Sequence, residues 1–240
     1  MKELHSLYKK ILKEGYKYTD TSRDIGMTQI SSHQINFDLE EGFPAVTTKK
    51  LYWRAVVGEL LWFLRGDTNI NYLLENNINI WNKDAYNFRM NSSNNPNGYY
   101  QAVCNINSLE DYLKACKEFP EDKIGNLGRV YGAQWRAFSK YGSYYEEYVD
   151  QISNLIKNLK ENPMSRRHIV TAWNPAELDD MALPPCHWSF EIIVEPLSIS
   201  RQPLFKKDDS KKGWTVNNDR SKYQFTLKWH QRSVDSFLGR

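Results

Sequence analysis

The sequence predicts an α+β fold in a single domain, residues 1–240. Apolar residues recur at helical spacing in four stretches, and two other stretches alternate apolar and polar residues as strands do. Apolar residues make up 40% of the chain and charged residues 25%, the composition of a globular protein with a substantial core. These patterns predict the helices and strands but not the topology of the sheet.

The N-terminal part begins with an amphipathic pattern that predicts a helix over residues 2–14, ending at Gly15. Short alternating stretches between residues 28 and 39 predict strands, and the Gly-Phe-Pro at 42–44 predicts a turn. A second, almost wholly apolar helix is expected over residues 52–65.

Two polar insertions are predicted, near residues 89–123 and 197–222. The first begins with a surface loop at 89–98, rich in Asn and Ser, and contains a short helix at 109–119. The second is strongly charged and is interpreted as a long solvated excursion from the same domain.

The C-terminal half is expected to supply the sheet. A helix near residues 149–159 ends before Asn162-Pro163, and a strand follows over 168–173. Alternation in 188–194 and 223–229 predicts two strands that form a hairpin with one buried face.

Charge and cysteine content exclude several classes of protein. A net charge of +3, without a basic arm, gives no reason to expect a nucleic-acid partner. The three cysteines, Cys104, Cys116 and Cys186, match neither a disulfide framework nor a metal site, so no metal and a cytoplasmic location are expected. No signal peptide or membrane anchor is expected, because apolar runs are too short.

Cys186 is the candidate nucleophile, because it follows Pro184-Pro185 at the mouth of a predicted strand. The alternative is an inert buried thiol, the commoner state of a lone cysteine. Glu59 lies on the apolar stripe of the second predicted helix, where a carboxylate serves either as a general acid or base or as a structural partner. Tyr131 lies in a glycine-bracketed turn, which either brings the phenol to a cleft or serves packing.

Four arginines, Arg23, Arg166, Arg167 and Arg232, lie beside serines in the sequence. Guanidinium and hydroxyl groups together bind phosphate well, although each arginine alone also fits a solvated surface charge. No glycine-rich loop for a nucleoside triphosphate is present in the sequence.

Seven segments together resemble the thymidylate synthase family, in the family's order and from about residue 2 to 239. They are GFPAVTTKK (42–50), ELLWFLRGDTN (59–69), VYGAQWR (130–136), SRRHIV (165–170), AWNPAEL (172–178), LPPCH (183–187) and QRSVDSFLG (231–239). The resemblance implies a large mixed β-sheet flanked by helices, with a sheet face used for dimerisation. It also implies methyl transfer from 5,10-methylenetetrahydrofolate, as co-substrate, to dUMP, giving dTMP and dihydrofolate.

The resemblance assigns roles to particular residues. Cys186 would add to C6 of the pyrimidine, Glu59 would organise waters and move protons, and Tyr131 would help remove the C5 proton. The implied substrate-binding residues are Arg23, Arg167, Arg232, Ser233, His187 and, across a homodimer, Arg166. The implied folate-binding residues are Lys49, Trp81, Asp84 and Asp235.

The sequence departs from the family in three places. The loop around Arg23 is shorter and less glycine-rich than the family's arginine loop, and Asp84 replaces a second tryptophan, which predicts weaker folate stacking. The chain ends at Arg240, before the family's uracil-reading asparagine and the His and Tyr that hold the deoxyribose, so no complete pocket is expected. The alternatives are a dUMP or dCMP hydroxymethylase of the same superfamily, against which Trp81 argues, and an inactive truncated product acting as a dimerising or nucleotide-binding module.

Overall fold

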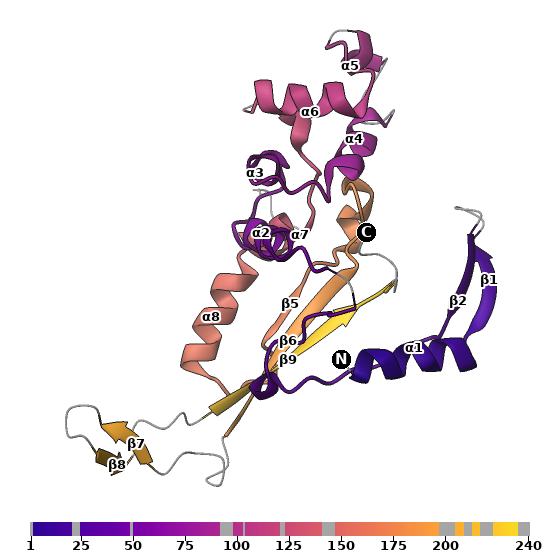
Figure 1. Cartoon of the computed structure of the whole chain (residues 1–240). Coiled ribbons are helices and arrows are strands. Elements are labelled where there is room, and N and C mark those ends of the chain that lie inside the picture. Colours follow the sequence, from indigo (N-terminus) through magenta and orange to yellow (C-terminus); the bar gives the residue numbers. More distant parts are fainter. Residues whose placement is uncertain are drawn as a thin grey trace. The chain divides into compact units, whose positions relative to one another are not determined.

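The computed structural model describes residues 2–20, 25–48, 50–91, 98–102, 104–120, 123–140, 147–196, 205–208, 213–216 and 223–234. The chain divides into two compact units, residues 1–53 and 54–240, which are described separately (Figure 1). The single-domain organisation stays a prediction.

The first unit consists of a helix and a β-hairpin. Helix α1 (Lys2–Glu14) ends at Gly15, as predicted, and strands β1 (Tyr16–Asp20) and β2 (Ile25–Gln29) pair antiparallel. The strands predicted between residues 28 and 39 are wrong beyond Gln29, because residues 30–38 adopt no regular structure. The alternation of apolar and polar residues alone did not produce a strand there, because a strand also needs partners for its backbone N–H and C=O groups. A 3₁₀ turn, η1 (Leu39–Glu41), follows.

The second unit begins with α2 (Trp53–Leu64), within one residue of the prediction at each end. Gly66 ends this helix with a φ of +77°, and the amides of Gly66 and Asp67 donate to the carbonyls of Phe63 and Trp62. This Schellman arrangement satisfies carbonyls at the helix end. The next helices are α3 (Asn71–Glu75), α4 (Asn82–Met90), α5 (Tyr99–Ala102) and α6 (Leu109–Glu118).

The first polar insertion is partly helical. Helix α6 was predicted, and Ser108 caps it by accepting a hydrogen bond from the Asp111 amide. The predicted surface loop at 89–98 is wrong at its start, because Arg89 and Met90 complete α4. Residues 92–97 lie outside the described residues.

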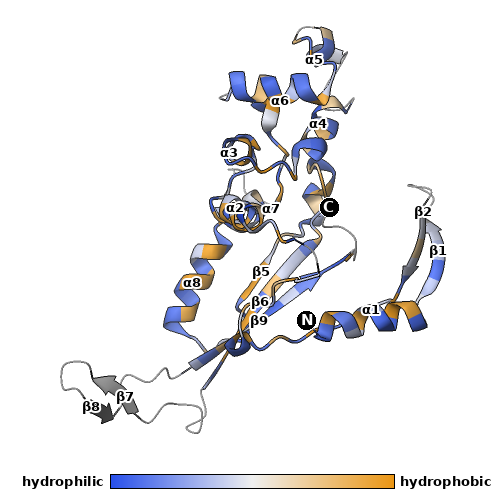
Figure 2. Cartoon of the chain, in the orientation of Figure 1, coloured by the Kyte–Doolittle hydropathy of each residue, from blue (hydrophilic) through white to orange (hydrophobic). Residues whose placement is uncertain are grey.

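The C-terminal part of the unit contains η3 (Lys123–Gly125), α7 (Tyr131–Arg136), β3 (Phe138–Ser139), β4 (Tyr148–Val149), α8 (Gln151–Glu161), β5 (Ile169–Thr171), η4 (Pro175–Asp180), β6 (His187–Pro196) and β9 (Tyr223–Gln231). Strands β5, β6 and β9 form an antiparallel sheet, so the predicted pairing of the last two strands is confirmed. Helix α8 lies beside β5 (Figure 1) and alternates hydrophobic and hydrophilic residues along its length (Figure 2). Strands β7 (Phe205–Asp208) and β8 (Gly213–Val216) pair within the second insertion.

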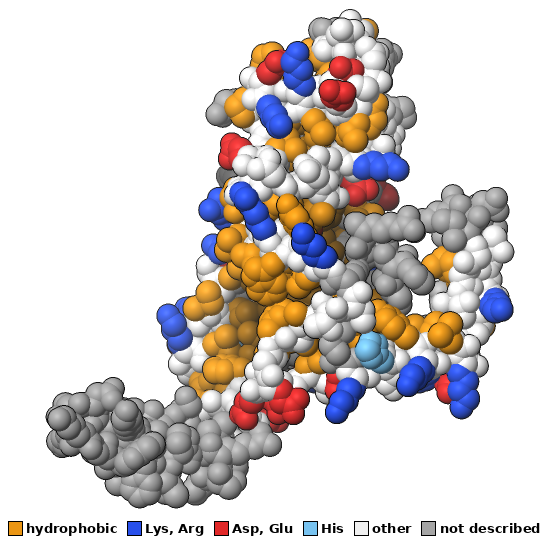
Figure 3. Space-filling model, viewed as in Figure 1, with side chains coloured by type: hydrophobic (Ala, Val, Ile, Leu, Met, Phe, Trp, Pro, Cys, Tyr) orange, Lys and Arg blue, Asp and Glu red, His pale blue; other side chains and the backbone are white. Residues whose placement is uncertain are grey.

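The sheet buries its apolar face unevenly. Phe190 and Val194 of β6 are 9% and 4% exposed, whereas their cross-strand neighbours Trp229 and Phe225 are 44% and 65% exposed. The prediction of one buried face therefore holds for β6 and is wrong for β9. Figure 3 shows exposed hydrophobic side chains gathered over the region of α2, α8 and the sheet.

The core joins the helices to the sheet. Its largest fully buried side chains include Trp62, Tyr112, Ile70, Leu127 and Val170. Burial of side chains of this size is the main stabilising contribution of such a core.

Candidate active site

Cys186 lies in the turn between η4 and β6, and its backbone is fixed on both sides. The amides of Cys186 and His187 both donate to the hydroxyl oxygen of Tyr131, at 2.8 and 3.1 Å. The Cys186 carbonyl accepts from the Arg232 amide at 2.9 Å. The cysteine is half-buried, with neither its amide nor its carbonyl left unpaired.

Arg232 secures the two prolines that precede the cysteine. Its Nε donates to the Pro185 carbonyl at 2.9 Å and its Nη2 donates to the Pro184 carbonyl at 2.6 Å. Its Nη1 donates to the Ser233 hydroxyl at 3.3 Å, and the guanidinium lies over the Trp173 ring. Because proline has no N–H, the carbonyl is the one backbone group of each of these two residues that can form a hydrogen bond.

Tyr131 begins helix α7 instead of lying in a turn, so that part of the prediction is wrong. The side chain is 3% exposed, and its ring stacks on Phe63 at 4.4 Å between centroids. Burial is the main cause that raises the pKa of Tyr131 to about 12, although the two amides that donate to it act in the opposite direction. The phenol is therefore protonated at neutral pH.

Glu59 projects from α2 towards Trp81, a partner that the apolar pattern of the helix did not predict. Its Oε1 accepts from the Trp81 indole Nε1 at 2.7 Å. Burial raises the pKa of Glu59, against the opposing effect of the Trp81 hydrogen bond. A carboxyl group with a raised pKa is suited to giving and taking protons nearer neutrality. Trp81 is itself 6% exposed and packs its ring against Trp62 and Tyr131.

His187 lies between the cysteine turn and β9. Its ring is 6.0 Å from that of Tyr131 and 5.4 Å from that of Trp229. Burial lowers the pKa of His187, which favours the neutral imidazole.

A polar cluster that sequence reasoning missed joins α7 to η4. Gln134 is fully buried and donates to Glu177 Oε2 at 2.6 Å, while Arg129 pairs with Glu177 Oε1 at 2.8 Å. The available signal was the polar Gln134 within the apolar segment 130–135, since a buried polar side chain requires a partner.

The other predicted residues are not brought to the cysteine. Arg166 and Arg167 are exposed, and neither guanidinium has a hydrogen bond or ion pair with the described part of the chain. Asp84 is half-buried on α4, and burial raises its pKa. Arg23, Lys49 and Asp235 lie outside the described residues.

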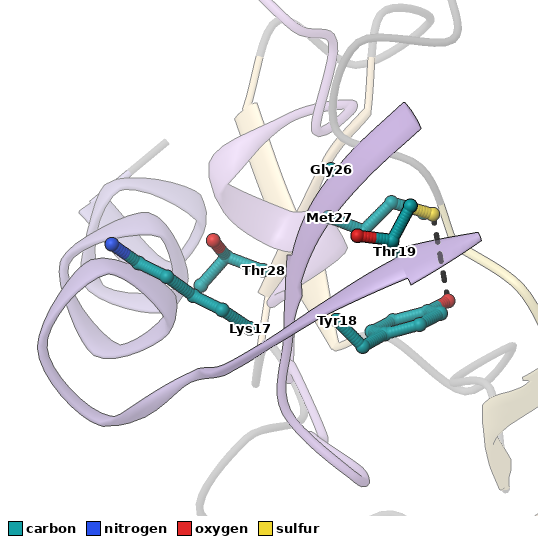
Figure 4. A pocket seen from close by; sticks show the side chains of 6 residues that line it. All are labelled: Lys17, Tyr18, Thr19, Gly26, Met27 and Thr28. Carbon is teal, nitrogen blue, oxygen red and sulfur yellow. Dashed lines mark hydrogen bonds between the residues drawn. The ribbon is translucent and has the colours of Figure 1, made fainter. Parts of the chain in front are cut away.

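Neither of two surface hollows is lined by Cys186. One, of about 730 Å³, is lined by Phe88, Arg89, Lys123, Asn126, Gly128, Asp179 and Asp180. The other, of about 400 Å³, lies on the β1–β2 hairpin, where the Tyr18 hydroxyl donates to Met27 Sδ (Figure 4). The aromatic and hydrogen-bonded surroundings of Cys186, and not these hollows, have the chemistry of an active site.

No group of three or more His, Cys, Asp or Glu side chains suitable for a metal occurs among the described residues. Within the same residues, no helix is both long and apolar enough to cross a bilayer.

Comparison with known proteins gives a consistent family. The family model for thymidylate synthase matches residues 2–240. The chain is 40% identical over 242 residues to the thymidylate synthase of Mesoplasma florum, covering 100% of this chain and 69% of that protein. It is 39% identical to the thymidylate synthase of Mycoplasma genitalium, covering 87% of this chain and 67% of that protein. It is 40% identical to the thymidylate synthase of Phytoplasma mali, covering 85% of this chain and 65% of that protein. The chain thus spans about two thirds of the length of these relatives.

Proposed function

Because the chain belongs to the thymidylate synthase family, whose members make dTMP from dUMP, we propose that Cys186 is the nucleophile that begins this methyl transfer. The observation that carries the proposal is the fixed turn around Cys186, held by Tyr131 on one side and Arg232 on the other. Such fixing keeps the sulfur of a nucleophile in one attack geometry. The sulfur bonds to C6 of the pyrimidine, and C5 becomes the carbon nucleophile.

The folate co-substrate, 5,10-methylenetetrahydrofolate, supplies the one-carbon unit and the hydride that reduces it to a methyl group. Glu59 and Asp84 fit this partner, because carboxyl groups with raised pKa values can exchange protons with its amines. Trp81 holds the Glu59 carboxyl in place and limits the access of water to it. In this proposal Lys49 and Asp235 bind the folate tail and the pterin.

Tyr131 assists removal of the C5 proton. Its hydroxyl oxygen accepts hydrogen bonds from two backbone amides, which occupy both of its lone pairs. The phenol therefore acts through its O–H, which can orient the water that takes the proton. His187, favouring the neutral form beside Cys186, completes the substrate side of the site.

The nucleotide phosphate is bound by arginines from two subunits. We assign Arg23, Arg167, Arg232 and Ser233 to the site of their own subunit and Arg166 to that of the other. The guanidiniums of Arg166 and Arg167 are exposed and have no partner among the described residues, which supports a role in binding phosphate, since a phosphate would pair with them.

The homodimer forms through the sheet face opposite α8. This face carries Ile169, 55% exposed, and Trp188, 39% exposed and packed beside His230. The sheet of the assembled enzyme is larger and mixed, extending the three described strands. A reduced thiol is required at Cys186, so we place the enzyme in the cytoplasm.

The experiment is tritium release from [5-³H]dUMP in the presence of methylenetetrahydrofolate. Release by the chain, lost in Cys186→Ala by at least about a thousandfold, is expected for a covalent nucleophile. Equal release by both proteins would exclude this role of Cys186. Cys104→Ala, at an exposed cysteine, is the matched control.

A further inference from the structure

The Glu177 carboxylate contacts three side chains from the segment around α7, two of which donate hydrogen bonds while the third, an arginine, forms an ion pair. Arg129 Nε lies 2.8 Å from its Oε1, the Ser139 hydroxyl donates to the same oxygen, and Gln134 Nε2 donates to Oε2 at 2.6 Å. These residues come from before, within and after the helix. A single side chain of η4 therefore fixes the whole length of α7.

The surroundings of Glu177 keep it ionised. Its side chain is 13% exposed, and burial raises its pKa, but the hydrogen bonds from Gln134 and Ser139, together with the interaction with Arg129, lower the pKa further than burial raises it. The second N–H of Gln134 donates to the Arg129 carbonyl at 2.8 Å, which ties two of these partners to each other. An ionised carboxylate with two donors and an arginine ion pair is a rigid connection.

A second connection joins the same two parts of the chain at the nucleophile. Glu177 and Cys186 both lie in the segment 177–186, and their partners Gln134 and Tyr131 both lie on α7. Between the two ends, the Ala182 amide donates to the Leu127 carbonyl at 2.9 Å. If α7 moved relative to this segment, the Tyr131 hydroxyl would leave the Cys186 amide.

We propose that Glu177 is a positioning residue of the active site, which acts by holding Tyr131 against the backbone of Cys186 and His187. The assignment rests on the proposed function, in which Tyr131 assists removal of the C5 proton. It adds a residue that has no contact with the reacting atoms.

The kinetic test uses Glu177→Gln, Tyr131→Phe and the double variant of the full chain. Glu177→Gln should lower the kcat of tritium release about tenfold with little change in the KM for dUMP. The double variant should be no slower than Tyr131→Phe alone, because both changes remove the same contribution. Glu177→Asp, which keeps the charge, should recover part of the loss.

A second measurement does not depend on activity. If Glu177 holds Tyr131, amide hydrogen exchange measured by NMR should speed up about tenfold at Cys186 and His187 in both Glu177→Gln and Tyr131→Phe. Glu161→Gln, the same change at an exposed residue of α8, should leave both amides protected. Ser139→Ala, which removes one donor, gives a milder variant should Glu177→Gln fold poorly.

The outcomes separate the two proposals. Multiplicative kinetic effects in the double variant, or unchanged exchange at Cys186 and His187, would overturn the role of Glu177. A wild-type chain that releases no tritium would instead overturn the proposed function, and the exchange result would still decide whether Glu177 holds Tyr131.

Discussion

At the scale of single residues, Glu59 combines a buried position with a polar partner. A carboxyl whose pKa is raised by folding costs stability once it ionises. Below the unfolded pKa both states are protonated and nothing is lost, whereas the cost grows as pH rises through the folded pKa. In the proposed role, the buried Glu59 carboxyl therefore lowers the stability of the fold when it ionises, and the same raised pKa suits it to proton transfer.

Glu59→Gln should remove this cost and keep an acceptor for Trp81. We expect the variant to match the wild type in thermal unfolding near pH 4 and to be more stable at pH 8, while dTMP formation falls at least about a hundredfold. Unfolding temperatures across this pH range and steady-state kinetics check both parts. Equal stability at pH 8 would contradict the prediction, and Glu75→Gln, at an exposed residue, is the control.

Arg232 holds the proline carbonyls and, in the proposed function, also binds phosphate, and one substitution can separate these two roles. Arg232→Lys keeps the charge but cannot hold both proline carbonyls, so the turn at Cys186 should loosen. We expect kcat to fall about tenfold or more. A rise in KM for dUMP with unchanged kcat would mean that phosphate binding is its only task, and Arg54→Lys, on an exposed part of α2, provides the comparison.

At the scale of elements, Gly128 lets α7 and the cysteine segment come together. It has a φ of +76°, and a Cβ there would lie 1.9 Å from the Asp180 carbonyl oxygen. Gly98 has a φ of +64°, but the nearest atom to its Cβ would be 3.6 Å away. A side chain at either glycine would therefore strain the backbone. Only at Gly128 would it also clash with another residue.

Gly128→Ala should lower the free energy of unfolding by roughly 3 kcal/mol, and Gly98→Ala by about 1 kcal/mol. Urea unfolding of both variants measures the difference. Similar losses in the two would show that the approach of Asp180 does not constrain Gly128.

The long elements could be predicted from the sequence because their periodicity extends over several turns or strand pairs. Helices α1, α2, α6 and α8 and the pairing of β6 with β9 were predicted in this way. Helices α3 and α7 have only 5 and 6 residues, too few to show a period, and their form depends on packing. Tyr131 was therefore predicted in a turn.

The candidate active site followed from the sequence to the extent that motifs name its residues. Cys186, Glu59 and Trp81 were named in this way, and the structure brings the last two within hydrogen-bonding distance, while their catalytic roles stay predictions. The Glu177 cluster could not be predicted, because its donors are brought together only by the packing of η4 on α7. The tasks of Arg232 likewise became visible only with the carbonyls it contacts.

At the scale of the whole molecule, the sheet has one face on α8 and another available for a second copy. Ile169→Glu would place a charge in the middle of the proposed interface, where desolvation is costly. We expect sedimentation to shift from dimer to monomer, with loss of dTMP formation because Arg166, as assigned in the proposal, no longer reaches the other site. Ile156→Glu, at an exposed position of α8, should remain dimeric; a dimeric Ile169→Glu variant would sink the proposed face.

The hydroxyl of Tyr131 also limits which reactions the cysteine can perform. Cysteine hydrolases stabilise a tetrahedral oxyanion with backbone amides near the nucleophile. Here the amides of Cys186 and His187 already donate hydrogen bonds to the Tyr131 hydroxyl. An acyl group bound to this sulfur would find no such donor at either amide, whereas addition to a ring carbon places the developing charge on a distant carbonyl of the substrate. If Cys186 is the nucleophile, as proposed, the turn therefore suits conjugate addition and disfavours ester or amide cleavage.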